Sequence, residues 1–225
     1  MKQLLVIAVL LLCLPAGAAE RPRDSEGAGG EHRPFSDVEY WAGVFEDESR
    51  KAWQMPLTVL EFLGIRKGET VADLGAGTGY FTRMLALEVG DEGRVYAVEI
   101  EQAMLDYLTR RDDIRQDRVT SVLAEPDDPK LPKGEIDLVV IMNTWHHVEK
   151  RTRYLKKLAR SLSEEGRVAI IDFYEGELPV GPPPGHKLSE ATVEKELRKA
   201  GWTVAAKSVA LPYQYLMIAK PPSRR

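Results

Sequence analysis

Apolar positions along the chain alternate between short continuous runs and longer stretches that are apolar on one face only. Five runs have the length and composition of buried strands, at residues 70–74, 94–100, 119–123, 137–142 and 167–173. Between them, helical periodicity predicts helices at about 80–88, 101–110 and 148–162. Alternation of this kind predicts a parallel sheet that is covered by helices on both faces.

Both ends of this alternating region carry further elements. Ser36 is suited to cap a short helix, and Pro56 suits the first turn of another helix that Gly64 ends. After a predicted helix at about 189–200, two strand-like runs follow at 202–211 and 213–219. The link between these runs is too short for a parallel crossover, so we expect an antiparallel hairpin.

The N-terminus has the form of an export signal over residues 1–19. Lys2 precedes an apolar run at 4–14, and small residues follow at 16–19. The run is shorter than the about 20 residues that span a bilayer, so we expect cleavage, no stable membrane insertion afterwards, and a periplasmic or secreted protein. An uncleaved anchor and a buried helix are the alternatives. Residues 20–34 are rich in Gly, Pro, Arg and Glu and predict a flexible linker before one domain at 35–225.

Composition narrows the chemistry. The chain has 31 basic and 35 acidic residues, a net charge of −4, and no continuous basic stripe, which argues against nucleic acid as a partner. Cys13 is the only cysteine and lies in the apolar run. A mature chain without it has no disulfide, no thiolate nucleophile and no cysteine zinc site.

The most informative segment is residues 71–80, VADLGAGTGY, in which a strand runs into a glycine-rich turn that opens a helix. Glycines at alternate positions allow a tight turn and let a ligand approach bare amides at a helix N-terminus. Asp73 ends the first strand, and Glu99 ends the next strand at about the spacing that places a carboxylate on a ribose. A dinucleotide site would place a third glycine where Tyr80 or Thr82 stands, and Asp73 would repel a pyrophosphate. A cationic sulfonium amino acid suits this carboxylate better.

With these residues, the chain resembles the class I S-adenosylmethionine (SAM)-dependent methyltransferases over about residues 53–220. The resemblance implies an α/β fold, a Rossmann-like doubly wound seven-stranded sheet, mostly parallel, with the C-terminal antiparallel hairpin. It implies that SAM is the cofactor. It assigns the amino acid part of SAM to Asp73 and the loop residues Gly75, Ala76, Gly77, Thr78 and Gly79. It assigns the ribose to Glu99 with Ile100, and the adenine to Glu125 within residues 124–127. Asn143 is the residue it places nearest the methyl group.

A narrower resemblance rests on residues 50–56, the His146–His147 pair and residues 211–215, which are similar to a poorly characterised, often exported group of predicted bacterial methyltransferases. His147, His146 and Asn143 are the candidate catalytic residues, with a histidine as base where the acceptor must lose a proton. The alternative for both histidines is that they cap the helix that follows. A zinc site that combines them with His186 has no support in their spacing.

Two other functions compete with methyl transfer to a small-molecule or cell-envelope acceptor. One is an exported protein that binds SAM or a related nucleoside without transferring methyl. The other is a nicotinamide-dependent oxidoreductase, which the missing third glycine disfavours.

Overall fold

The computed structural model describes residues 34–208 and 210–223. The predicted export signal, Cys13 and nearly all of the predicted linker lie outside the described residues. Within the described part, no helix combines the length and the apolar character that crossing a bilayer would require. The helices and strands run in the order α1 (Val38–Phe45), η1 (Glu48–Arg50), α2 (Lys51–Gln54), α3 (Pro56–Leu63), β1 (Thr70–Leu74), α4 (Tyr80–Glu88), β2 (Arg94–Glu99), α5 (Gln102–Thr109), β3 (Val119–Leu123), β4 (Ile136–Met142), η2 (Trp145–His147), α6 (Arg151–Ser161), β5 (Leu162–Phe173), η3 (Pro184–His186), α7 (Glu190–Lys199), β6 (Thr203–Ser208) and β7 (Gln214–Lys220).

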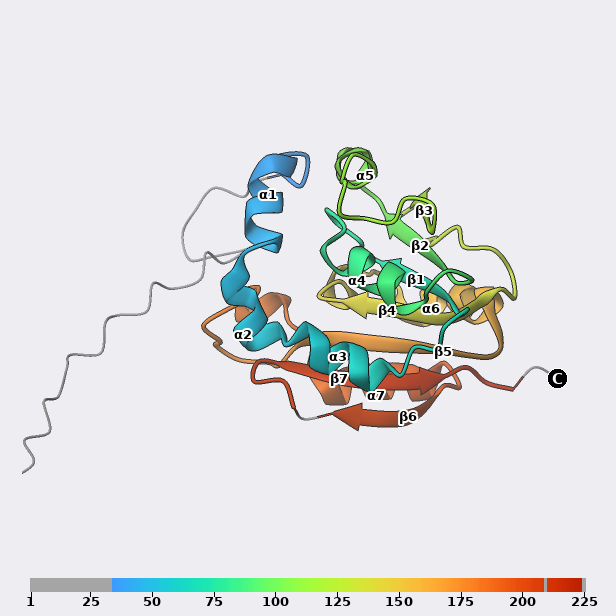
Figure 1. Ribbon diagram of the computed structural model, residues 1–225. Coiled ribbons are helices and arrows are strands. Elements are labelled where there is room, and N and C mark those ends of the chain that lie inside the picture. The colour runs from blue at the N-terminus through green and yellow to red at the C-terminus, as the bar shows by residue number, and fades with distance from the viewer. Residues whose placement is uncertain (1–33, 209, 224–225) are drawn as a thin grey trace, which may run out of the picture.

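The strands form one seven-stranded sheet in the order β3-β2-β1-β4-β5-β7-β6 (Figure 1). Strands β1 to β5 pair in parallel, whereas β7 pairs antiparallel with both β5 and β6. The predicted α/β Rossmann-like sheet with a C-terminal antiparallel hairpin is therefore confirmed. Strand β7 lies between β5 and β6, so the hairpin extends the sheet at one edge.

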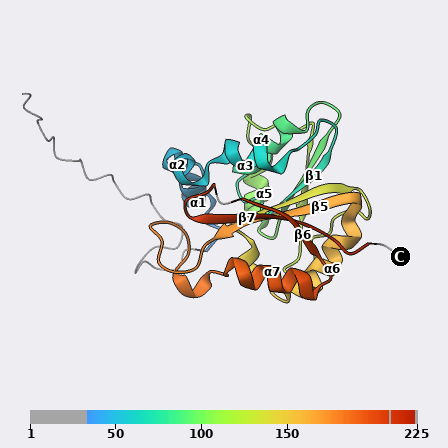
Figure 2. The same cartoon turned by 90° about the horizontal axis from the view of Figure 1, so that it is seen from below.

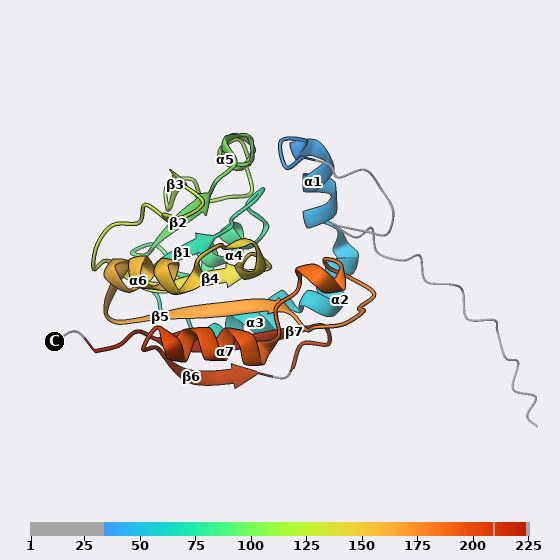
Figure 3. The ribbon, with the colours of Figure 1, turned by 180° about the vertical axis from the view of Figure 1, so that it is seen from behind.

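Two layers of helices cover the sheet because successive side chains of a strand point to opposite faces. On one face, Ala72 and Val139 pack against α6 and α7 through Leu155 and Leu197. On the other face, Val71, Val95, Leu138 and Val140 pack against α3 and α4 through residues such as Leu60 and Leu85. Figure 2 shows α3 and α4 above the sheet and α6 and α7 below it, and Figure 3 shows the α6–α7 layer from behind.

Several element bounds differ from the predicted ones. Helix α1 follows Asp37 rather than Ser36. The helix expected from residue 148 begins at Arg151, after the short 3₁₀ helix η2. Strand β5 begins at Leu162, directly after α6, rather than at residue 167. The polar run at 163–165 hides this start, which depends on pairing of Leu162 with Ile136 and a register shift before the strands pair again.

The order of the strands sets the position of the site. Strand β1 lies between β2 and β4, so the chain leaves β1 towards one side of the sheet and later returns to the other side. The carboxyl ends of β1, β2, β4 and β5 carry Asp73, Glu99, Met142 and Phe173. Ligands of doubly wound sheets bind at this edge, next to the point where the strand order reverses.

Candidate active site

A cavity of about 470 Å³ lies at this edge, within the size range of small-molecule sites, roughly 300–1,000 Å³. The carboxyl ends of the strands contribute Asp73, Glu99 and Phe173 to its wall. Of the site residues that were predicted individually, Gly79 alone does not line it. The ones that do are Asp73, Gly75, Ala76, Gly77, Thr78, Glu99, Ile100, Glu125, Asn143, His146 and His147.

The glycine loop is shaped by close contacts with three other elements. Gly75 has φ 81°, and a Cβ there would lie 2.1 Å from the Thr144 hydroxyl oxygen in the segment after β4. Gly79 has φ 90°, and its Cβ would lie 2.9 Å from Leu108 Cγ on α5. Gly77 faces Phe45 at the end of α1, with 3.2 Å between its Cβ position and the ring. Only glycine fits both the left-handed backbone and these approaches.

The expectation of bare loop amides is wrong for four of the loop residues. The N–H groups of Gly75 and Ala76 donate to the Val98 carbonyl at 2.8 and 3.1 Å. That of Gly77 donates to Glu99 Oε2 at 2.9 Å, and that of Gly79 to the Ala76 carbonyl. Because these donors are already engaged, the loop contributes a close backbone surface rather than hydrogen bonds from these amides.

Asp73 is buried at the cavity wall, with 2% of its surface exposed. Its Oδ2 accepts a 2.6 Å hydrogen bond from the Thr82 hydroxyl on α4. Burial raises the pKa of Asp73 to about 6, although the Thr82 hydrogen bond opposes this, and the nearby Glu99 charge adds to it. A cation in the cavity would favour the ionised carboxylate. Thr82 stands at one position where a dinucleotide site would need glycine, and here it orients Asp73.

Glu99 closes the opposite side of the loop. Its Oε2 accepts from Gly77, and its Oε1 accepts from the backbone N–H groups of Ile100 and Glu101 at 2.7 and 3.2 Å. Burial raises the pKa of Glu99, against the effect of these three hydrogen bonds. A carboxylate has about four acceptor positions, so these bonds orient Glu99 and leave capacity for a hydroxyl of a ligand.

The predicted adenine side is brought together in part. Ile100 is 51% exposed at the cavity rim, and Glu125 forms a 2.8 Å ion pair with Lys130. Met104 is buried against Trp41 of α1. Within the predicted segment 124–127, Asp127 is the residue that does not line the cavity, and its carboxylate lies 3.6 Å from Lys157 Nζ instead.

Asn143 follows β4 with a left-handed backbone, φ 55°. Its Oδ1 accepts a hydrogen bond from Gln214 Nε2, at the start of β7. Gln214 is fully buried and its Oε1 has no partner among the described residues. The side-chain amide of Asn143 in the cavity wall is therefore oriented by Gln214, a residue far away in the sequence.

The two histidines differ in their surroundings. His147 is exposed and its ring lies edge-on to Phe35, with 6.2 Å between the centroids. The His146 side chain is only 3% exposed, and its Nδ1 lies 2.8 Å from Asp172 Oδ1. Neither histidine caps α6, whose preceding residue is Lys150. His186 does not line the cavity, and within the described residues no group of three or more His, Cys, Asp and Glu side chains is placed to hold a metal.

Sequence reasoning missed a cover over the cavity, formed by Phe35 and by Trp41 and Phe45 of α1. Glu46, directly after α1, forms an ion pair with Arg111, which also donates to the Thr78 carbonyl at 3.2 Å. The cover thereby contacts the glycine loop. No local pattern signals this, since Glu46 and Arg111 are 65 residues apart.

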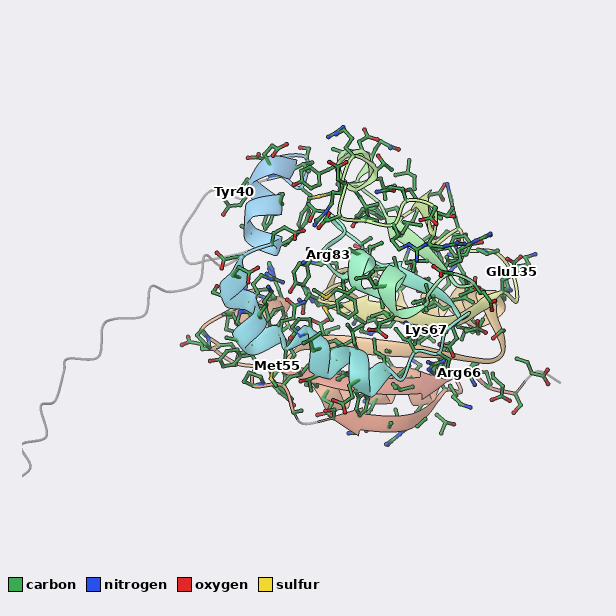
Figure 4. The ribbon with its side chains drawn as sticks, in the orientation of Figure 1. Tyr40, Met55, Arg66, Lys67, Arg83 and Glu135 are labelled. Atoms are coloured by element: carbon green, nitrogen blue, oxygen red, sulfur yellow. The ribbon has the colours of Figure 1, made fainter. Side chains whose placement is uncertain are left out.

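Arg50 was also missed. The Arg50 guanidinium lies 4.9 Å from the Trp53 ring centroid and donates to Gln54 Oε1 at 3.2 Å. The left-handed Met55 (φ 45°) turns the chain between α2 and α3, as Figure 4 shows, and both Arg50 and Gln54 line the cavity. Arg50 is a cation on this largely apolar and acidic wall.

Known proteins resemble the chain in sequence and fold. Residues 72–170 match the family described as "Methyltransferase domain". A ubiquinone/menaquinone biosynthesis C-methyltransferase (UbiE) of Vibrio campbellii is 30% identical over 157 residues, 68% of this chain and 58% of the relative. The UbiE of Enterobacter sp. is 31% identical over 114 residues, which are 49% of this chain and 45% of that relative. The chain thus spans less than two thirds of the curated relatives it matches.

Solved structures support the same assignment. A SAM-dependent methyltransferase from Aquifex aeolicus superposes with a TM-score of 0.75 at 27% identity, over 84% of this chain and 98% of that one. A DhpI complex with S-adenosylhomocysteine (SAH) shares the fold, with a TM-score of 0.66 at 19% identity over 84% and 94% of the two chains. The domain match and the Aquifex aeolicus structure identify residues 72–170 as a methyltransferase domain, on a chain with the fold of the class I SAM-dependent methyltransferases.

Proposed function

We propose that the protein transfers the methyl group of SAM to a small acceptor with an apolar body, inside the cavity at the carboxyl edge of the sheet. The observation that carries this proposal is the placement of Asp73 and Glu99 on one cavity, on either side of a loop whose glycine positions leave no room for a side chain. Two oriented carboxylates of this kind suit a ligand with a cationic end and a hydroxylated sugar.

The residues present fit the cofactor. Asp73 would accept hydrogen bonds from its ammonium group, because this carboxylate is buried and no basic side chain of the described residues pairs with it. Glu99 would bind the ribose hydroxyls, and Ile100, Met104 and Glu125 would surround the adenine. Asn143 would lie near the reacting end, since it lines the cavity beyond β4.

When bound, SAM supplies an electrophilic methyl group on a sulfonium. The attacking atom of the acceptor, the methyl carbon and the sulfur must lie on one line for the displacement. Alignment of the acceptor with the methyl group is therefore the main contribution that the protein can make. The aromatic cover of Phe35, Trp41 and Phe45 would exclude water from the cavity and would stack against a planar acceptor. Phe173 supplies a further aromatic surface at the end of β5.

The class of acceptor is the finer part of the proposal. Most of the exposed cavity wall is apolar and aromatic, beside five acidic residues, Arg50, two histidines and a few other polar side chains. This composition favours an aromatic small molecule or a lipid-like envelope component. The UbiE relatives are named as C-methyltransferases, which supports carbon among the acceptor atoms. We also propose that residues 1–19 export the protein, so that the acceptor is periplasmic or extracellular.

Calorimetry of the purified protein with SAM and SAH tests the cofactor site. We expect saturable binding of both, and Glu99→Ala should weaken it by roughly 1–3 kcal/mol through lost hydrogen bonds. Glu165→Ala, in an exposed ion pair with Lys220, is the control that should bind normally. Absence of binding by folded protein would contradict the proposal.

Methyl transfer is tested by incubating the protein with deuteromethyl-SAM and cell-envelope extract, followed by mass spectrometry. We expect SAH and a labelled small molecule. Binding of SAM without SAH formation would instead support a nucleoside-binding protein.

A further inference from the structure

A buried acid that the proposed function does not use lies behind His146. Asp172 is at the carboxyl end of β5, and its side chain is 2% exposed. His146 Nδ1 lies 2.8 Å from Asp172 Oδ1 and 3.0 Å from Oδ2. The two residues are 26 positions apart and meet only because the segment after β4 lies beside the end of β5.

The Asp172 carboxylate binds the backbone of His146 and Phe173 as well as the His146 ring. Its Oδ2 accepts the backbone N–H of His146 at 3.0 Å, and its Oδ1 accepts that of Phe173 at 2.9 Å. An ionised carboxylate is an acceptor only, so Nδ1 of a neutral His146 carries the proton and Nε2 is left with a lone pair. Within the described chain no hydrogen-bond partner of Nε2 is found, and His146 lines the cavity.

Two other titratable groups face this pair. The His147 ring lies 4.1 Å from the His146 ring, centroid to centroid. Tyr215 of β7 is directly opposite Asp172 in the antiparallel register. Burial, and secondarily the charge of Asp172, raises the pKa of Tyr215, so this phenol stays neutral. Neither neighbour places a fixed positive charge on Asp172 that would compete with His146.

We propose that Asp172 is a positioning residue that holds His146 as the proton acceptor of the reaction, and that the methyl acceptor is therefore a phenol, an enol or an acidic carbon. This rests on the proposed function. The acceptor proton passes to His146 Nε2 while the acceptor oxygen or carbon forms its bond to the methyl carbon and the carbon–sulfur bond breaks. The products are the methylated acceptor, SAH and an imidazolium that returns its proton to solvent.

The activity test compares His146→Gln and Asp172→Asn with His186→Gln, which replaces an exposed histidine outside the cavity wall. With envelope extract and deuteromethyl-SAM, we expect product formation to fall about 10²- to 10⁴-fold in the first two variants and to stay normal in the third. Calorimetry with SAH should give affinities within about 3-fold of wild type. Normal turnover by His146→Gln, or label found on nitrogen or sulfur, would overturn the proposal.

A spectroscopic readout does not depend on the acceptor. Nitrogen-15 NMR of the SAH complex, with the histidines labelled and the His146 signals assigned by their loss in His146→Gln, should show His146 with its proton on Nδ1. In Asp172→Asn, the proton should be distributed differently between Nδ1 and Nε2. An Nε2–H form in the wild-type protein would overturn the proposal. Absence of any product from wild-type protein would count against the proposed function, and this NMR result would still decide the role of Asp172.

Discussion

At the scale of a single residue, we expect Asp73 to link the stability of the protein to the proposed binding of SAM. Burial raises its pKa from 3.8 to about 6 in the folded chain, so its favourable contribution to folding is full below pH 3.8 and is lost as the pH rises through 6. The ionised carboxylate thus destabilises the protein at neutral pH when no cation lies beside it. SAM binding should strengthen as the pH rises through about 6.

Asp73→Asn should therefore stabilise the ligand-free protein at pH 7, by up to about 3 kcal/mol, and should weaken SAM binding. The gain should vanish below about pH 4. Denaturant unfolding across this pH range, with calorimetry at pH 7, measures both effects. Glu69→Gln is the matched control at the other end of β1: this buried acid pairs with Arg167 at 3.2 Å, so its loss should destabilise the protein and leave SAM affinity unchanged. A destabilised Asp73→Asn at pH 7 would contradict the expectation.

The cost of a side chain at Gly75 can be compared with the cost at Gly68, a glycine with a similar φ angle and no close neighbours. Gly68 has φ 89° and no atom within 4 Å of the position that a Cβ would take, so Gly68→Ala should cost only the left-handed strain, about 1–2 kcal/mol. Gly75→Ala adds the contact with Thr144 and should cost about 1–3 kcal/mol more, with weaker SAM binding. Thr144→Ala in the same chain should recover part of this difference. Equal unfolding free energies for the two single variants would show that Thr144 yields without cost.

At the scale of elements, the position of α1 over the cavity depends on contacts with α5, with the glycine loop and with Arg111. Trp41 packs on Met104 of α5, Phe45 on the glycine loop, and Glu46 pairs with Arg111. The Arg111 side chain is 11% exposed, so its hydrogen bonds to Glu46 and to the Thr78 carbonyl are only partly screened by water. The cover should therefore control release of a bound ligand.

Arg111→Ala should speed dissociation of SAH about 10-fold, the equivalent of roughly 1.4 kcal/mol, through loss of charge-assisted hydrogen bonds. Stopped-flow tryptophan fluorescence measures it, since Trp41 lines the cavity. Arg115→Ala removes ion pairs of Arg115 with Asp91 and Asp117 away from the cavity and should leave the rate unchanged. The same rate in both variants would show that Glu46 and Arg111 do not hold the cover closed.

Export belongs to the scale of the whole molecule. Residues 1–19 are proposed as a cleaved signal, and mass spectrometry of the protein from its native host should find an N-terminus at Glu20. A mature chain that begins at Met1 would contradict export by cleavage. Copurified SAM or SAH in the same spectrum would show that the cofactor is supplied where the protein resides.

The sequence by itself determined the order of the main strands and helices and the core of the proposed cofactor site. Strand β1, helix α4, Asp73, the glycines and Glu99 were all predictable, because a strand, its turn and the next helix are adjacent in the chain and leave local periodicity and glycine spacing. Asp172 was within reach of the same reasoning, since it is a third acid near the carboxyl end of an apolar strand.

Only the tertiary structure decided which distant residues meet. His146 with Asp172, Gln214 with Asn143 and Arg111 with Glu46 join residues 26, 71 and 65 positions apart. The internal hydrogen bonds of the loop amides and the early start of β5 likewise depend on partners in other strands. Such contacts follow from strand order and packing, for which no short segment carries a signal.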